Sequence, residues 1–142
     1  MSIHPTALVA DTAILADDIE VGAYSIIGDA VEIGRGCRID SHVVINGPTK
    51  IGDDNHIYQF CSVGDDPQDK KYANEPTRLE IGDGNTIREF CTISRGTTQD
   101  QGVTWVKGTL TSNLLVDLCD RELVNADLAV CLFKNRLVFC YR

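Results

Sequence analysis

Residues 21–62 read VGAYSI-IGDAVE-IGRGCR-IDSHVV-INGPTK-IGDDNH-IYQFCS, and each of these six-residue units begins with Val or Ile. The same phase extends in both directions, and its first positions are Ile3, Val9, Leu15, Val21, Ile27, Ile33, Ile39, Ile45, Ile51, Ile57, Val63, Ile81, Ile87 and Ile93. A period of six matches neither an amphipathic helix nor a single alternating strand. It favours a parallel β-helix, in which three short strands and three corners make one coil and the first-position aliphatics stack inside.

The second and fifth positions of the units are also restricted. Glycine occupies the second position at residues 22, 28, 34, 52, 64 and 82, which predicts a sharp corner with an unusual φ there. The fifth position holds mostly small or β-branched residues, which predicts a second inward-facing site. Cys37, Cys61 and Cys91 fall at that position, so we interpret them as small buried thiols instead of metal ligands or nucleophiles. Because no cysteine pair has CxxC spacing, we expect neither disulfides nor a metal site.

The segment DDPQDKKYANEPTRLE, residues 65–80, loses the phase and introduces two prolines. We interpret it as an external loop that leaves one corner of the prism and returns at Ile81. Its polar side chains include Asp69, Lys70, Lys71, Tyr72 and Arg78. Such groups can hydrogen-bond a sugar and neutralise a phosphate, and long loops on a rigid scaffold often carry function. A solvated surface excursion explains the same composition, so both interpretations stay open at this point.

Length and charge narrow the class of protein. A chain of 142 residues suggests one domain, and its net charge of −8 is unevenly distributed. Residues 1–102 carry 17 acidic and 8 basic side chains, a net of −9, whereas residues 103–142 carry 4 and 5, a net of +1. The acidic part argues against a nucleic-acid-binding face. The first residues lack the basic and apolar regions of a leader, and no apolar run approaches a membrane span, so we expect a cytoplasmic protein.

The loop also carries a family resemblance. The segment QDKKYANEPTR at 68–78, followed by IGD at 81–83 and RGT at 95–97, resembles the UDP-N-acetylglucosamine O-acyltransferases that begin lipid A biosynthesis in Gram-negative bacteria. The resemblance extends over residues 1–104. It implies an all-β, left-handed parallel β-helix and a homotrimer with active sites in the clefts between neighbouring prisms. It also implies transfer of a 3-hydroxyacyl chain from acyl carrier protein to the 3-hydroxyl of UDP-N-acetylglucosamine, without a cofactor.

The resemblance implies roles for particular residues. In the family, an Asp of the loop and the Lys two places later help to hold the nucleotide sugar, which implies that role for Asp69 and Lys71, with Gln68 just before them. The family's general base is a histidine in a stretch like HIAHD after the RGT segment, and no histidine follows His56 in this chain. Ser94 stands where the family often has another active-site histidine. We therefore assign no catalytic residue and predict that this chain is nearly inactive.

The last part of the chain departs from the repeat. In residues 114–142, 19 of 29 side chains are apolar, and neither helix nor strand periodicity is clean. SNLL at 112–115 is similar to the DNLL that precedes the family's catalytic coil. We therefore divide the chain into a β-helix, 1–104 with its loop at 65–80, and a divergent tail, 105–142. A shifted reading frame would explain the tail, and so would a segment that caps the open end of the prism.

Other functions can be weighed against the same repeat pattern. The chain could bind a nucleotide sugar without catalysis, or insert into the trimer of a complete relative. A γ-class carbonic anhydrase shares the scaffold but needs three histidines on one zinc, and His4, His42 and His56 show no suitable spacing. We expect these three at exposed corners or faces, or at a subunit interface. An ice-binding solenoid needs a flat face of threonine ranks, which the repeats lack.

Overall fold

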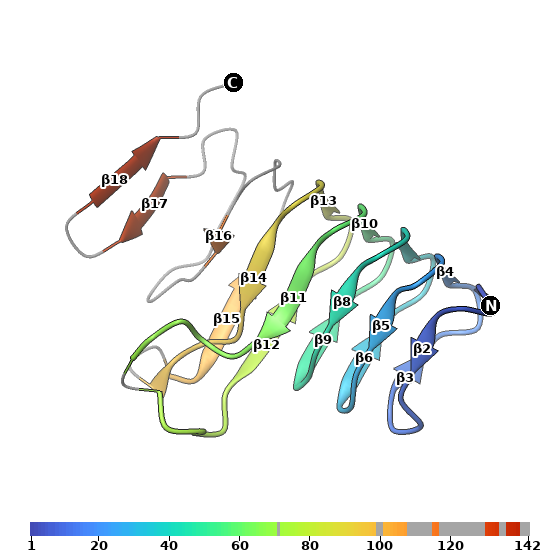
Figure 1. Cartoon of the computed structure of the whole chain (residues 1–142), viewed down its shortest axis with the longest axis horizontal. Coiled ribbons are helices and arrows are strands. Elements are labelled where there is room, and N and C mark those ends of the chain that lie inside the picture. The colour runs from blue at the N-terminus through green and yellow to red at the C-terminus, as the bar shows by residue number, and fades with distance from the viewer. Residues whose placement is uncertain (71, 99–100, 108–114, 117–129, 134–135, 140–142) are drawn as a thin grey trace.

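The chain is wound into a three-sided prism of short parallel strands (Figure 1). The computed structural model describes residues 1–70, 72–98, 101–107, 115–116, 130–133 and 136–139. Up to β15, each strand lies on the next side of the prism, so every third strand joins the same sheet. The predicted parallel β-helix is therefore confirmed.

Three parallel sheets form the sides of the prism. Sheet A consists of β1 (Ser2–Ile3), β4 (Glu20–Val21), β7 (Arg38–Ile39), β10 (His56–Ile57) and β13 (Thr86–Ile87). Sheet B consists of β2 (Leu8–Val9), β5 (Ile26–Ile27), β8 (Val44–Ile45), β11 (Ser62–Asp65), β14 (Thr92–Ser94) and β16 (Leu115–Val116). Sheet C consists of β3 (Ile14–Leu15), β6 (Val31–Ile33), β9 (Thr49–Ile51), β12 (Arg78–Ile81) and β15 (Val103–Val106). A separate antiparallel pair consists of β17 (Val130–Phe133) and β18 (Arg136–Phe139).

The register of sheet A shows where the regular winding is interrupted. Ile3 pairs with Val21, and Ile39 pairs with Ile57, so partners in these coils are 18 residues apart. Ile57 pairs with Ile87, which is 30 residues later. The coil that joins β10 to β13 is therefore twelve residues longer than its predecessors. Those extra residues form the loop between β11 and β12.

The interior confirms the predicted inward positions. First-position aliphatics from Val21 to Ile93 are at most 3% exposed, whereas Ile3, on the edge strand of sheet A, is 36% exposed. Each buried aliphatic of this kind contributes about 1.5–3 kcal/mol. The fifth positions also point inward, and Cys37, Cys61 and Cys91 are buried, reduced thiols there.

Two fifth positions hold amides in place of small apolar groups. Asn55 and Asn85 are each 1% exposed, and Asn85 Nδ2 donates to Asn55 Oδ1 at 2.7 Å. Asn55 Nδ2 donates in turn to the carbonyls of Gly52 and Gly82, each at 2.9 Å. Buried carbonyl groups need such donors, because an unpaired one costs free energy. The two amides therefore pair corner carbonyls from successive coils.

The prediction that second-position glycines supply the unusual φ is wrong for every one of them except Gly64, whose φ is 79°. Left-handed backbone occurs instead at fourth positions, as at Tyr24 (φ 58°) and Phe60 (φ 64°). A second-position glycine is needed for another reason at Gly22, where an added Cβ would lie 2.6 Å from the backbone nitrogen of Ser41. The close approach of neighbouring coils excludes a side chain there.

The far end of the prism bears on the predicted domain division. The expected boundary at residue 104 falls within β15, which pairs with β12, and β16 pairs with β14. Most of the predicted tail, 105–142, lies outside the described residues. The division and both explanations of the tail therefore stay predictions. In the part of the chain that is described, no helix has the length and hydropathy needed to cross a membrane.

Candidate functional site

The loop of residues 66–77 leaves the prism between β11 and β12 (Figure 1). Its first end is fixed by Asp65, whose carboxylate accepts hydrogen bonds from Asn46 Nδ2 and Ser62 Oγ, both at 2.5 Å. The backbone N–H of Arg95 donates to the Asp65 carbonyl at 2.9 Å. The pairing of β11 with β14 shifts register at this point, between Val63 and Asp65. The loop therefore departs from a bulge that side chains hold in place.

The predicted sugar-binding residues lie in the first half of this loop. Gln68 is exposed and Asp69 is half-buried, whereas Lys71 lies outside the described residues. The backbone N–H of Tyr72 donates to the Asp69 carbonyl at 2.9 Å, so Asp69 begins a hydrogen-bonded turn. Gln68 directly precedes the turn that Asp69 begins. The place of Lys71 beside them stays a prediction.

Three buried hydroxyls, in the last loop residue and in the strands that pair with β11 and β12, have no hydrogen-bond partner among the described residues. They are Thr77 Oγ1, Ser94 Oγ and Thr104 Oγ1. Ser94 is only 1% exposed, so the residue at the family's histidine position lies inside the wall of the prism. Nucleophilic catalysis by a serine needs a base within hydrogen-bond reach. Ser94 Oγ has no such partner in the described part of the chain.

The sequence analysis assigned no role to Arg95, although the RGT motif contains it. Its side chain is 11% exposed, and its guanidinium donates to the carbonyls of Gly47 and Gly64 and to the hydroxyl of Tyr72. A buried guanidinium is costly unless its donors are satisfied. Both terminal nitrogens of Arg95 have acceptors, whereas Nε is buried without a hydrogen-bond partner among the described residues. An arginine directly after a buried strand was the one signal in the sequence that pointed to such a network.

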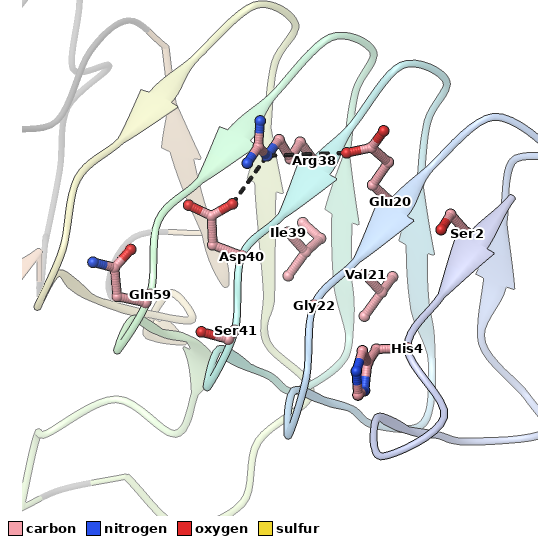
Figure 2. Close-up of a pocket in the computed structure, with 10 residues that line it drawn as sticks. All are labelled: Ser2, His4, Glu20, Val21, Gly22, Arg38, Ile39, Asp40, Ser41 and Gln59. Atoms are coloured by element: carbon pink, nitrogen blue, oxygen red, sulfur yellow. Dashed lines mark hydrogen bonds and ion pairs between the residues drawn. The ribbon is translucent and has the colours of Figure 1, made fainter.

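A second polar area is a hollow of about 510 Å³ on sheet A (Figure 2). In its lining, Arg38 Nε lies 3.1 Å from Asp40 Oδ1 and 4.0 Å from Glu20 Oε2. The positive charge of Arg38 is therefore balanced within the hollow. His4 and Gln59 lie on its walls, and no loop residue lines it. The hollow is thus separate from the predicted sugar-binding residues.

The three histidines lie in different surroundings. His4 lines the hollow, and His56 Nε2 lies 3.2 Å from Asp40 Oδ2 on sheet A. His42 is exposed at a corner, where its ring lies between two aromatic rings. Within the described residues, no three His, Cys, Asp or Glu side chains are grouped so that they could hold a metal ion.

The titratable groups with shifted pKa values lie away from the loop. Arg88 donates to both carboxylate oxygens of Glu89, at 2.9 and 3.0 Å, and this lowers the pKa of Glu89. Burial raises the pKa of the Cys37 thiol. A hydrogen bond with the Cys91 side chain lowers the pKa of Cys61, but Cys61 is only 2% exposed. Neither thiol is accessible enough to act as a nucleophile on a substrate.

Comparison with known proteins adds a family to this geometry. A curated protein of Saccharophagus degradans, acyl-[acyl-carrier-protein]–UDP-N-acetylglucosamine O-acyltransferase, is 60% identical over 102 residues, which are 72% of this chain and 40% of that protein. The crystal structure of UDP-N-acetylglucosamine O-acyltransferase (LpxA) from Moraxella catarrhalis matches with a TM-score of 0.80 and 50% identity, covering 82% of this chain and 46% of that one. Over this segment the chain is LpxA-like. LpxA from Acinetobacter baumannii gives a TM-score of 0.78 and 47% identity, covering 81% and 45% of the two chains.

The LpxA-like segment confirms the predicted family resemblance and, with it, the left-handed β-helix. No protein-family model matches the chain. The chain spans about two fifths of the length of the curated relative. What a complete LpxA does therefore bears on this chain only as a proposal.

Proposed function

We propose that this chain belongs to an enzyme that transfers a 3-hydroxyacyl group from acyl carrier protein to the 3-hydroxyl of UDP-N-acetylglucosamine, the first step of lipid A biosynthesis. The observation that carries the proposal is the 60% identity over 102 residues to an acyltransferase named for that donor and acceptor. Within this chain, the loop of residues 66–77 is the part that contacts the nucleotide sugar. The reaction needs no cofactor, and we place it in the cytoplasm.

The loop's side chains suit a nucleotide sugar. Gln68 is exposed and directly precedes the turn that the half-buried Asp69 begins, so both can reach a ligand beside the prism. A carboxylate accepts hydrogen bonds from sugar hydroxyls, and an amide can both donate and accept. The ammonium of Lys71 would face the diphosphate, whose charge it can partly neutralise. In this proposal Asp69 and Gln68 orient the sugar, and Lys71 supplies the charge.

The same reading predicts little turnover by this chain. Attack of the sugar hydroxyl on a thioester requires a base for its proton, and loss of a general base costs about 10²–10⁴ in rate. The sequence contains no histidine after His56. His56 faces Asp40 on sheet A, outside the loop, and Ser94 is buried. We therefore expect binding of the nucleotide sugar with very slow acyl transfer.

A second candidate is a non-catalytic fragment that binds the nucleotide sugar or inserts into the trimer of a complete relative. An exposed apolar edge where sheets A and B meet favours it. This edge consists of Leu8, Tyr24, Ile26, Phe60 and Phe90, which are 65%, 61%, 41%, 50% and 59% exposed. Covering apolar area of this kind with another subunit lowers the free energy of the assembly. A homotrimer of this chain would use the same edge.

Calorimetry with UDP-N-acetylglucosamine on the full chain tests the proposal. We expect binding that Asp69→Asn and Lys71→Ala each weaken by about tenfold, since each removes a charged hydrogen-bond partner. Lys50→Ala is the matched control, because the Lys50 side chain is 68% exposed on sheet C and lies 3.8 Å from Glu32, away from the loop. Absence of binding by the unmodified chain would refute the proposal.

A thioester assay separates the two candidates. With 3-hydroxyacyl carrier protein and UDP-N-acetylglucosamine, we expect release of the carrier thiol far below the rate of complete LpxA. Turnover at the rate of complete LpxA would contradict the predicted inactivity. It would also exclude the non-catalytic candidate, so that only the acyltransferase remained. Light scattering reports whether three copies assemble, or whether the chain enters a trimer only when complete LpxA is present.

A further inference from the structure

Arg95 lies at the root of the loop, and its side chain connects the prism to two loop residues, Asp66 and Tyr72. It follows β14 directly, and its side chain is 11% exposed. Nη1 donates to the carbonyl oxygen of Gly47 at 2.7 Å and to that of Gly64 at 3.0 Å. These carbonyls belong to two successive coils, so one nitrogen bridges both at the corner where the loop departs.

The second terminal nitrogen of the guanidinium reaches into the loop. Nη2 forms an ion pair with Asp66, the first residue after β11, and donates to the hydroxyl of Tyr72 at 3.3 Å. The Tyr72 hydroxyl donates to the Glu75 carbonyl, also at 3.3 Å. Arg95 therefore contacts the beginning of the loop directly, its middle through Tyr72, and its end through Tyr72 and Glu75.

Tyr72 connects Arg95 to the proposed sugar-binding turn. The backbone N–H of Tyr72 donates to the Asp69 carbonyl at 2.9 Å, so the residue whose hydroxyl Arg95 contacts also closes, through its backbone, the turn that Asp69 begins. A planar guanidinium can satisfy several acceptors at fixed angles, whereas a lysine ammonium offers a single point charge. The guanidinium of Arg95 thus connects two carbonyls of the coils with two side chains of the loop, those of Asp66 and Tyr72.

We infer that Arg95 is a positioning residue for the loop and fixes the place of Asp69 through Tyr72. A loop of this length without the guanidinium samples many arrangements, and a ligand then binds only the fraction that presents Asp69 correctly. The apparent Kd rises by the inverse of that fraction. Arg95 itself does not touch the nucleotide sugar. The effect on binding rests on the proposed function, but the effect on loop order does not.

The test uses the full chain with Arg95→Ala, Arg95→Lys and Tyr72→Phe. Arg35→Ala is the matched control, because the Arg35 side chain is 78% exposed and its ion pair with Asp53 is a surface contact of 3.9 Å. Hydrogen exchange of the peptide over residues 66–77 reports loop order, and thermal unfolding reports the prism. Calorimetry with UDP-N-acetylglucosamine reports the binding consequence.

We expect Arg95→Ala to accelerate exchange in the loop and to weaken binding by about tenfold or more. The loop exchange rate and the affinity of Arg95→Lys should lie between those of Arg95→Ala and the unmodified chain. Tyr72→Phe should weaken binding by about threefold with an unchanged unfolding temperature. Guanidinium chloride at millimolar, non-denaturing concentration should restore part of the affinity of Arg95→Ala, and sodium chloride of equal ionic strength should not. A residue needed only for folding would show no such rescue.

Unchanged loop exchange in Arg95→Ala would overturn the inference, whether or not any ligand binds. Binding by Arg95→Ala within about twofold of the unmodified chain would overturn it as well. Failure of the unmodified chain to bind would instead refute the proposed function, and the exchange result would still decide the role of Arg95. If Arg95→Ala does not fold, the exchange and affinity of Tyr72→Phe decide the matter, because that change removes one hydroxyl only.

Discussion

Between residues 3 and 63 the chain repeats one six-residue unit, whereas between residues 66 and 77 nothing is repeated. In the first region, each buried aliphatic lies between equivalents in neighbouring coils, as Ile57 lies between Ile39 and Ile87. In the second region, contacts converge on one side chain, Arg95. The prism is thus ordered by many equivalent contacts, and the loop by a few contacts that have no substitute.

The residues that stabilise the fold are therefore different from those that would bind a ligand. A truncation inside the prism removes buried apolar area and lowers the free energy of unfolding of the whole prism. A change at the loop's root alters where Asp69 lies while the coils keep their core. The sequence of the loop can therefore change to suit a ligand, because the loop contributes little to the stacked aliphatic side chains inside the prism. The predictions below test that separation, beginning with the largest effect.

Ile57→Ala should destabilise the prism most. Ile57 is 0% exposed in the middle of sheet A, and truncation of a buried isoleucine to alanine costs about 2–5 kcal/mol. Ile14→Ala is the matched control, because Ile14 is 64% exposed and should lose about 0.5 kcal/mol or less. Denaturant unfolding measures both. Equal losses for the two variants would mean that the stacked interior is not the main source of stability.

Gly22→Ala should have the next largest effect. The added Cβ would lie 2.6 Å from the Ser41 nitrogen and 2.7 Å from the Asp40 carbonyl carbon, and overpacking of this kind costs about 1–3 kcal/mol. Gly82 also occupies a second position, but its nearest neighbour would be Lys107 Cγ at 3.5 Å. Gly82→Ala should therefore change the free energy of unfolding little. A loss in Gly82→Ala as large as that in Gly22→Ala would contradict the conclusion that the close approach of neighbouring coils selects glycine at position 22.

Glu89→Gln should have the smallest effect. The hydrogen bonds from Arg88 lower the pKa of Glu89, so its stabilising contribution is present above the ordinary carboxyl pKa and is lost as the pH falls through the lowered value. Arg88 is exposed and Glu89 is half-buried, and they form a surface ion pair between sequence neighbours. We therefore expect an unfolding temperature within about 1 °C of the unmodified chain at neutral pH. Scans from neutral to acid pH should show the two proteins converging. A difference that widens in acid would contradict the sign of the shift.

The six-residue period was sufficient to predict the coils and both inward positions, because the register follows directly from a strict repeat. It could not show which corner residue adopts the left-handed conformation. Tyr24, His42, Phe60 and Phe90 do so with bulky side chains, and their rings form a column with centroids 5.3 Å apart. Ring contacts between coils offset a local strain that single-residue preferences would forbid.

The candidate site was only partly predictable for a related reason. Composition and resemblance pointed to Gln68, Asp69 and Lys71, because charged loop residues are visible in the sequence itself. The role of Arg95 depends on contacts with Gly47, 48 residues earlier, and with Tyr72, 23 residues earlier. Such contacts exist only once the corner, the bulge at Gly64 and the loop are folded together. No local pattern records them.

Paired residues of sheet A are 18 residues apart in the early coils and 30 apart between β10 and β13, and this difference has a kinetic consequence. Each early coil can close against its predecessor as soon as 18 further residues have left the ribosome, so winding follows synthesis closely. Bringing Ile87 onto Ile57 closes a longer segment, at an extra entropic cost of about 0.5 kcal/mol. Winding of the nascent prism should therefore be delayed after β10, and the edge of the coil at Ile57 should stay exposed until twelve additional residues have emerged.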